Sequence, residues 1–349
     1  MQRRRDSASD RGIRANIHRI LMITCITGAT GFIGSHLVDR LLAQGHTVRV
    51  LVRATSNLQW LEGKNISFIE GDIRDQASLD GFLSGADYVY HVAGVVKARD
   101  RKEYFEGNEG ATRNMLEATK RVAPGVRRFL FVSSQTAAGP APSLNDATHE
   151  DSTCSPITTY GESKLAAERV VREYEGVIPC TIVRPPAVYG PRDTEIFIYF
   201  QAVARGLNSM IGFNDKRLSL VHVEDLVSGI ILAAEARSSI GQTYFIASES
   251  YYSWPEVGAI TARALQTRPI TIRLPHMIVY SVAAIAQAVA ALTGKAATLN
   301  VEKARDITQA YWICSIDKAQ RELGYVQRYP LEKGIPETIA WYKTQGWLT

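Results

Sequence analysis

The sequence predicts an α/β protein, with a doubly wound parallel sheet and a smaller C-terminal lobe. Over the first half of the 349-residue chain, short apolar runs alternate with amphipathic stretches of helical period. Strands that are apolar throughout and separated by helices are typical of a parallel sheet covered on both faces. The composition, 46% hydrophobic and 21% charged, fits a globular chain and excludes a disordered one.

The individual elements follow from this alternation. We expect strands at Met22–Thr27, Val48–Val52, Ile66–Glu70, Tyr88–Val92, Phe129–Val132 and Cys180–Val183. The helices between them are expected at Phe32–Gln44, Glu103–Val122 and Tyr160–Glu175. Beyond Pro185 the pattern breaks, proline and glycine become frequent, and further helices are expected at Glu195–Arg205 and Val223–Ala236.

This change of pattern suggests two domains. Residues 21–190, together with 222–246, are expected to form the nucleotide-binding domain, because Val223–Ala236 is expected to return to the sheet. Residues 191–221 and 247–349 are expected to form the substrate-binding lobe. Ligands of open α/β sheets bind outside the carboxyl ends of the strands, so the site is expected between sheet and lobe.

Charge and cysteine content exclude several classes of protein. The net charge is +5, and residues 1–20 carry six Arg against two Asp, so the rest of the chain is close to neutral and does not predict a nucleic-acid-binding protein. We interpret residues 1–20 as a basic disordered arm or a mis-set start, with an Arg-rich transit peptide as a third interpretation. The four cysteines are far apart, which argues against a cysteine-based metal site and favours a reducing, cytoplasmic location. No metal site is expected.

A glycine-rich turn joins the first strand to the first helix. Its sequence, TGATGFIG over residues 27–34, spaces three glycines as G-x-x-G-x-x-G. Glycine permits a tight turn and close backbone approach, and the helix start offers free N–H groups to a pyrophosphate. The alternative is a plain strand-to-helix turn, but the βαβ context favours a Rossmann-type dinucleotide site. The residues expected to contact the cofactor here are Gly28, Thr30, Gly31, Phe32, Ile33 and Gly34.

The end of the second strand indicates which dinucleotide binds. Proteins that bind NAD usually place a carboxylate here for the ribose 2′-hydroxyl, whereas this chain has Arg53 followed by Ala54, Thr55 and Ser56. A guanidinium at this point can pair with a 2′-phosphate, so we favour NADP(H) over NAD(H). Asp72, at the end of the third strand, is placed either to accept from the adenine amine or to cap a helix.

Tyr160 and Lys164 are candidates for proton transfer. They lie at i and i+4 at the start of an expected helix, and therefore on one helix face. A free tyrosine has a pKa of about 10. A neighbouring ammonium and an oxidised nicotinamide are expected to lower this pKa by about 1–3 units, which would suit exchange with a carbonyl or alcohol oxygen. Ser134, just past the strand Phe129–Val132, can donate to the same oxygen.

The order of these motifs resembles that of the extended short-chain dehydrogenases/reductases. The matching segments are TGATGFIG (27–34), GDIRD (71–75), HVAG (91–94), FLFVSS (129–134), YGESK (160–164), RPPAVYGP (184–191) and DKAQRELGY (317–325). The resemblance implies catalytic roles for Ser134, Tyr160 and Lys164, and for Asn108 as the active-site asparagine. It also implies cofactor contacts by Ile73, Ala93, Gly94, Tyr160, Lys164, Pro185 and Val188. Relatives commonly form homodimers through two helices, which here are Glu103–Val122 and Tyr160–Glu175.

Within this family the sequence is similar to the branch of dihydroflavonol-reductase-like and 3β-hydroxysteroid-dehydrogenase-like members. Epimerases of the UDP-galactose type have an asparagine where this chain has Ala187, and an arginine where it has Leu218. These differences favour an NADP(H)-dependent oxidoreductase of a small apolar or amphipathic ketone, aldehyde or alcohol. The alternatives are a nucleotide-sugar epimerase or dehydratase without net cofactor turnover, and a non-catalytic nucleotide-binding module.

Residues 274–294 form an uncharged apolar run bounded by Arg273 and Lys295. Five large apolar residues recur at helical spacing and form one stripe: Ile278, Val282, Ile285, Val289 and Leu292. We interpret the run as a helix packed on its own domain, with a substrate-pocket wall or a peripheral membrane contact as alternatives. The polar residues within it argue against a helix that crosses a membrane.

Overall fold

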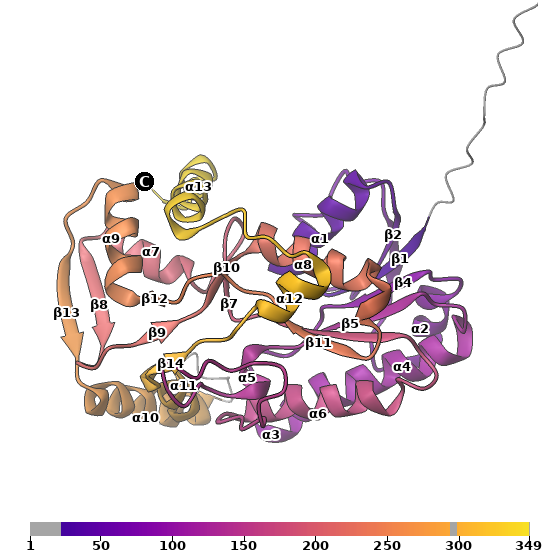
Figure 1. Cartoon of the computed structure of the whole chain (residues 1–349), viewed down its shortest axis with the longest axis horizontal. Helices are drawn as coiled ribbons and strands as arrows, with labels where there is room; N and C mark the ends of the chain where they lie inside the picture. Colours follow the sequence, from indigo (N-terminus) through magenta and orange to yellow (C-terminus); the bar gives the residue numbers. More distant parts are fainter. Residues whose placement is uncertain (1–21, 294–298, 349) are drawn as a thin grey trace, which may run out of the picture.

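The computed structural model, which describes residues 22–293 and 299–348, contains a seven-stranded sheet in which every pairing is parallel (Figure 1). The strand order is β3–β2–β1–β4–β5–β6–β11. The strands are β1 Ile23–Thr27, β2 Thr47–Val52, β3 Ser67–Glu70, β4 Tyr88–His91, β5 Arg128–Val132, β6 Cys180–Arg184 and β11 Gln242–Phe245. The order reverses between β1 and β4, and this Rossmann-type switch point is where such sheets bind ligands.

Two layers of helices cover the sheet. Helices α1 (Phe32–Ala43), α8 (Val223–Glu235) and α12 (Asp317–Leu323) contribute to the core on one face, and α2 (Gln76–Leu83), α4 (Ala111–Val122) and α6 (Thr159–Glu173) to the core on the other (Figure 1). Strand β5 explains why both faces are apolar: Leu130 and Val132 enter the first core, whereas Phe129 and Phe131 enter the second. Alternate side chains of one strand point to opposite faces, so a strand buried on both sides is apolar throughout.

Most predicted elements are present within one or two residues, but the predicted helix Glu103–Val122 is wrong as a single element. The structure divides this region into α3 (Arg101–Phe105), a π-helical turn η1 (Glu106–Gly110) and α4. A π-turn inserts an extra residue into the helix and turns a side chain that an α-helix would direct elsewhere. Asn108 lies in the middle of this turn and is buried.

The C-terminal part contains short strands and further helices beyond the main sheet (Figure 1). The strand pairings are β7 (Ala187–Tyr189) with β10 (Leu220–His222), β8 (Leu207–Ile211) with β13 (Ile270–Leu274), and β9 (Arg217–Leu218) with β12 (Tyr252–Ser253) and β14 (Tyr311–Trp312). The helices of this part are α7 (Phe197–Ala204), α9 (Trp254–Leu265), α10 (His276–Thr293), α11 (Val301–Thr308) and α13 (Leu331–Thr344). Two short helices lie between elements of the main sheet instead: α5 (Gln135–Ala138) follows β5, and η2 (Arg237–Ser239) precedes β11.

Helix α10 occupies most of the apolar run 274–294 and packs on its own domain, as interpreted, but the predicted stripe is not the side that packs. Val279 and Ala283 are buried and form a small core with Ala304 of α11. The predicted stripe lies on the opposite side and is exposed, with Ile285 65% and Leu292 89% accessible. In the part of the chain that the structure describes, no helix is long and apolar enough to cross a membrane. The interpretation of residues 1–20 lies outside the described residues.

Candidate active site

The turn between β1 and α1 has the backbone geometry of a phosphate-binding loop. Gly28 has φ +72°, and a Cβ there would lie 2.7 Å from the backbone nitrogen of Ala93. A Cβ on Gly34 would lie 2.1 Å from the carbonyl oxygen of Gly28, so neither position accepts a side chain. Helix α1 begins at Phe32 after Gly31, and no side chain caps its N-terminus. The first N–H groups of α1 and the positive end of its dipole therefore suit an anionic group.

A groove of about 340 Å³ leads away from this turn along the carboxyl ends of β1, β2 and β4. Its lining includes seven of the residues predicted to contact the cofactor, namely Gly28, Thr30, Arg53, Asp72, Ile73, Ala93 and Gly94. Thr27, at the end of β1, also lines it. Ser56 also lines it, and its hydroxyl accepts a hydrogen bond of 3.0 Å from the Arg53 backbone nitrogen. The groove includes the glycine turn, where the backbones of Gly28 and Ala93 approach closely, and this fits a dinucleotide.

Asp72 has a partner that the sequence reasoning missed. The Arg74 side chain donates from Nε to Oδ1 at 2.9 Å and from Nη2 to Oδ2 at 2.7 Å. These hydrogen bonds lower the pKa of Asp72 to about 2. The alternative role of Asp72 as a helix cap is wrong, because Asp75 accepts from the first N–H groups of α2. Arg74 and Arg53 both line the groove, so two guanidinium groups lie near the carboxyl ends of β2 and β3.

Ser134 and Tyr160 meet at the carboxyl end of β5. Ser134 caps the short helix α5, where its Oγ accepts from the Thr136 hydroxyl at 2.8 Å and from the Thr136 backbone N–H at 3.2 Å. Because its oxygen is used as the acceptor, its own proton is free to be donated. A hydrogen bond from Ser134 lowers the pKa of the Tyr160 phenol, but burial outweighs it and raises that pKa to about 12.

Lys164 lies one turn further along α6 and is buried. Its Nζ donates to the Val132 carbonyl oxygen at 2.8 Å and lies 4.2 Å from the centre of the Phe131 ring. Burial lowers the pKa of the ammonium to about 7, although the carboxylate of Glu168 acts in the opposite direction. The prediction that Lys164 lowers the pKa of Tyr160 is therefore not seen in this arrangement. The ammonium is directed at the strand end and at Gly94, where an added Cβ would lie 3.5 Å from Nζ.

Asn108 supports the site through its side chain. Its Oδ1 accepts from the Val95 backbone nitrogen at 2.9 Å, and its Nδ2 donates to the Val95 carbonyl at 3.0 Å and to the Ser163 hydroxyl at 2.9 Å. These bonds join the segment after β4 to helix α6, so the cofactor groove and the Tyr160 helix are held in one frame. The amide oxygen and both amide hydrogens are already bonded within the protein. The contacts of Asn108 are therefore those of a positioning residue and do not match the predicted direct catalytic role.

A buried ion pair behind the predicted catalytic residues was also missed by the sequence reasoning. Glu168 of α6 faces Arg184 at the end of β6, with Nη2 and Oε2 2.6 Å apart. Ser133 donates to Glu168 Oε1 at 2.5 Å, which connects the pair to the strand end that carries Ser134. Spacing gives no signal for this pair, because the two residues come from different elements.

The remaining predicted contacts lie at neighbouring strand ends. The carbonyl of Pro185 accepts from the Gln135 backbone nitrogen at 2.8 Å, which places Pro185 beside the helix that Ser134 caps. Val188 belongs to β7 and pairs with Val221 of β10. Phe32 and Ile33 form the first turn of α1. Among the described residues no cluster of His, Cys, Asp or Glu could hold a metal ion.

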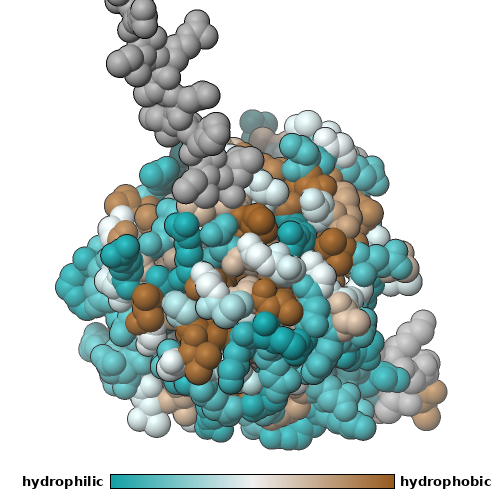
Figure 2. Space-filling model, turned by 90° about the vertical axis from the view of Figure 1, so that its right-hand side faces the viewer, coloured by the Kyte–Doolittle hydropathy of each residue, from teal (hydrophilic) through white to brown (hydrophobic). Residues whose placement is uncertain are grey.

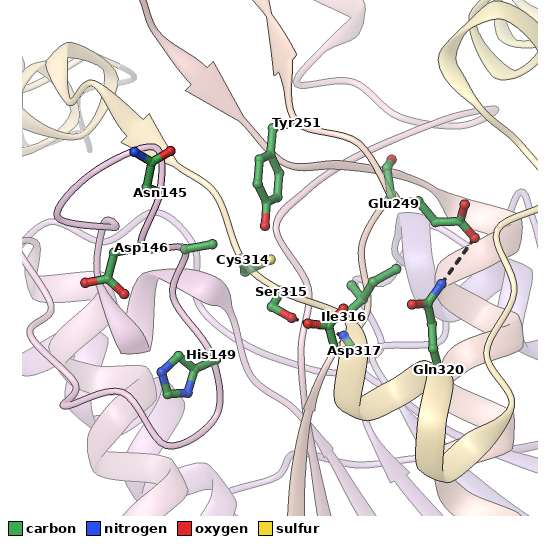
Figure 3. Close-up of a pocket in the computed structure, with 12 residues that line it drawn as sticks. Asn145, Asp146, His149, Glu249, Tyr251, Cys314, Ser315, Ile316, Asp317 and Gln320 are labelled. Carbon is green, nitrogen blue, oxygen red and sulfur yellow. Dashed lines mark hydrogen bonds between the residues drawn. The ribbon is translucent and has the colours of Figure 1, made fainter.

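A second hollow, of about 570 Å³, lies elsewhere (Figure 3). It is lined by residues of the loop after α5, such as Asp146 and His149, and by Glu249, Tyr251 and Gln320 from the C-terminal half. The Gln320 amide donates to Glu249 at 3.3 Å across one side. None of the predicted catalytic or cofactor residues is among those that line this hollow.

With the fold and the grouped residues established, the chain can be placed among known proteins. It matches the NAD dependent epimerase/dehydratase family over residues 24–247, and it belongs to this family. The fold and the relatives below also identify it as an extended short-chain dehydrogenase/reductase, an enzyme class that uses a pyridine nucleotide. The predicted family resemblance and the predicted α/β fold class are confirmed.

Several curated relatives span nearly the whole chain. A ceramide reductase of Caulobacter vibrioides is 31% identical over 328 residues, covering 93% of this chain and 96% of the relative. A 3 beta-hydroxysteroid dehydrogenase/Delta 5-->4-isomerase of Mycobacterium tuberculosis is 29% identical and covers 95% and 92%. Among solved structures, that of gox2253 has a TM-score of 0.78 at 29% identity, covering 94% and 99%. A UDP-glucuronic acid 4-epimerase of Bacillus cereus in complex with NAD has a TM-score of 0.74 at 23% identity and supports the fold alone.

Proposed function

We propose that this protein is an NADP(H)-dependent oxidoreductase that interconverts a ketone or aldehyde and an alcohol on a small apolar or amphipathic substrate. The observation that carries the proposal is the convergence of Ser134, Tyr160 and Lys164 at the strand ends beside the dinucleotide groove. Two relatives whose names state a ceramide and a hydroxysteroid as substrates support the apolar class. Residues 21–190 with 222–246 would bind the cofactor, and 191–221 with 247–349 the substrate.

The proposed chemistry divides between cofactor and protein. When bound, the nicotinamide supplies or accepts the hydride. In reduction, Tyr160 donates its proton to the carbonyl oxygen as the carbon receives the hydride, and in oxidation it takes that proton back. Ser134 donates a hydrogen bond to the same oxygen, since Thr136 already occupies its acceptor side. Lys164, while protonated, stabilises the negative charge left on the phenol.

The preference for NADP(H) is supported by Arg53 and Arg74 in the groove. A 2′-phosphate carries negative charge that a guanidinium pairs with in two hydrogen bonds, whereas a 2′-hydroxyl gains little from it. The predicted cytoplasmic location and the predicted homodimer through α4 and α6 stay predictions.

The test is the Tyr160→Phe variant, assayed by NADPH oxidation with an apolar ketone and by NADPH binding. Loss of the phenol proton should reduce turnover by about 10²–10⁴-fold while NADPH binding changes little. Tyr104→Phe is the matched control, because its ring lies 6.2 Å from that of Tyr160 and its hydroxyl bonds to the backbone, donating to the Val96 carbonyl at 3.4 Å. Unchanged turnover in Tyr160→Phe would refute the proposal. Epimerisation of a nucleotide sugar without net NADPH consumption would support the alternative instead.

A further inference from the structure

Helix α10 exposes large apolar side chains on its outward side in addition to the apolar side chains that it buries. Its outward side carries large apolar side chains that are all exposed, namely Met277, Ile278, Val282, Ile285, Val289 and Leu292. Another side of the helix contacts α11: the Tyr280 hydroxyl lies 3.2 Å from that of Thr308, and Gln287, itself exposed, accepts from the Val301 backbone nitrogen at 3.1 Å. Surface helices normally turn their apolar stripe to the core. A contiguous exposed apolar face of this kind marks an interaction site.

The charges around α10 favour an anionic lipid surface as the occupant. Residues 257–293 contain no Asp or Glu, whereas Arg263, Arg268 and Arg273 supply positive charge. Arg268 and Arg273 are exposed on the segment that leads into α10. An apolar helix face flanked by cations is the combination that binds membrane interfaces, where the stripe enters the acyl boundary and the cations meet phosphate headgroups. By contrast, the end of the molecule seen in Figure 2 is mainly hydrophilic, with apolar side chains interspersed.

The same helix lies close to the catalytic tyrosine. Helix α11 packs against α10, and Glu302 of α11 accepts from the Thr159 backbone nitrogen at 3.1 Å and from the Thr159 hydroxyl at 2.6 Å. Thr159 directly precedes Tyr160. Only one helix therefore separates the exposed stripe from the start of α6 that carries the phenol.

We propose that α10 is a docking helix for an anionic membrane surface, and that docking places the approach to Tyr160 next to the lipid phase. The docking itself does not depend on the reaction, whereas the delivery of an apolar substrate from the lipid rests on the proposed function. The helix lies in the interface and does not span it, because its inner face is held by α11.

The test is flotation of the full-length protein with vesicles of phosphatidylcholine and phosphatidylglycerol. We expect the protein to float with these vesicles, less with pure phosphatidylcholine, and less at high salt. An Ile285→Asp/Val289→Asp double variant should bind at least about tenfold more weakly, because it removes two apolar contacts and adds two negative charges. Val177→Asp is the control, since Val177 is 57% exposed, outside α10.

Three results would overturn the proposal. Absence of flotation of the wild-type protein at low salt refutes docking. Equal flotation of the double variant and the wild type refutes the role of α10. Dissociation of an oligomer by the double variant in lipid-free solution, measured by light scattering, identifies the stripe as a face between two copies instead. NADPH binding in the same samples reports on the cofactor site separately, so failure of docking and failure of the proposed function are distinguishable.

Discussion

Replacing Glu168 by glutamine removes the carboxylate that pairs with the buried Arg184 guanidinium. Arg184 is 3% exposed and Glu168 2%, so water cannot replace the lost charge. The Arg184 Nη1 atom has no hydrogen-bond partner, and the guanidinium bonds to Glu168 through Nε and Nη2 and to the Cys154 sulfur, a weak acceptor, through Nη2 at 3.2 Å. Removing one partner of such a pair leaves the other charge buried and uncompensated, which lowers the free energy of unfolding by about 3–5 kcal/mol.

We expect the glutamine variant to lie at the lower end of this range, about 3 kcal/mol, because its amide oxygen can still accept from Ser133 and Arg184. The measurement is the free energy of unfolding from urea denaturation at pH 7. Glu173→Gln on the same helix is the matched control, since Glu173 pairs with Arg113 at the surface and water can replace that contact. A loss below about 1 kcal/mol in Glu168→Gln would refute the account of the pair as buried and interdependent.

The same substitution should alter the pH dependence of activity. Glu168 raises the pKa of Lys164 against the effect of burial, so its removal lowers that pKa below about 7. If the ammonium is needed for turnover, activity falls as pH rises through this pKa, and in the variant the fall begins at lower pH. An unchanged pH profile would show that Lys164 and Glu168 are not electrostatically coupled in the working enzyme.

Two further predictions concern the cofactor and acid stability. Arg53→Ala should weaken NADPH binding more than NADH binding by about tenfold, and Arg74→Ala less, because Asp72 already pairs with Arg74; equal losses for both nucleotides would contradict the preference for NADP(H). Burial lowers the pKa of His91 to about 3 from 6.5, so unfolding takes up a proton between these pH values and the free energy of unfolding falls as pH drops from about 6.5 toward 3. In urea titrations across this range His91→Phe should show a flatter dependence than the wild type, and an identical slope would contradict the assignment.

Sequence reasoning located the site where local pattern and chain order carry the information. The glycine turn at residues 27–34 lies in one continuous stretch, and the Tyr160–Lys164 spacing is local to one helix. Strand ends of a parallel sheet meet at one edge, so Ser134 could be placed near both from strand order alone. Arg74 was two residues from a predicted contact, Asp72, and the fork geometry of its guanidinium could have suggested the pair.

What sequence reasoning could not predict depends on burial and on contacts between distant elements. The ion pair of Glu168 and Arg184 joins a helix to a strand end, and no spacing rule connects them. The π-turn at Glu106–Gly110 adds one residue to a helix whose propensities are ordinary, so only tertiary packing specifies it. The stripe on α10 was found correctly, but periodicity gives the stripe and not its direction, and here it faces outward.

The pKa values of the catalytic pair show how burial changes the functional argument. A spacing argument treats Tyr160 and Lys164 as an exposed pair in which the ammonium lowers the pKa of the phenol. Burial reverses the order, with the pKa of Tyr160 raised to about 12 and that of Lys164 lowered to about 7, because both charged forms lose hydration. Near neutral pH the phenol is then protonated and ready to donate, while the amine is the group whose charge changes. If the proposed function is correct, the charge on Lys164, supported by Glu168, sets the pH range of activity.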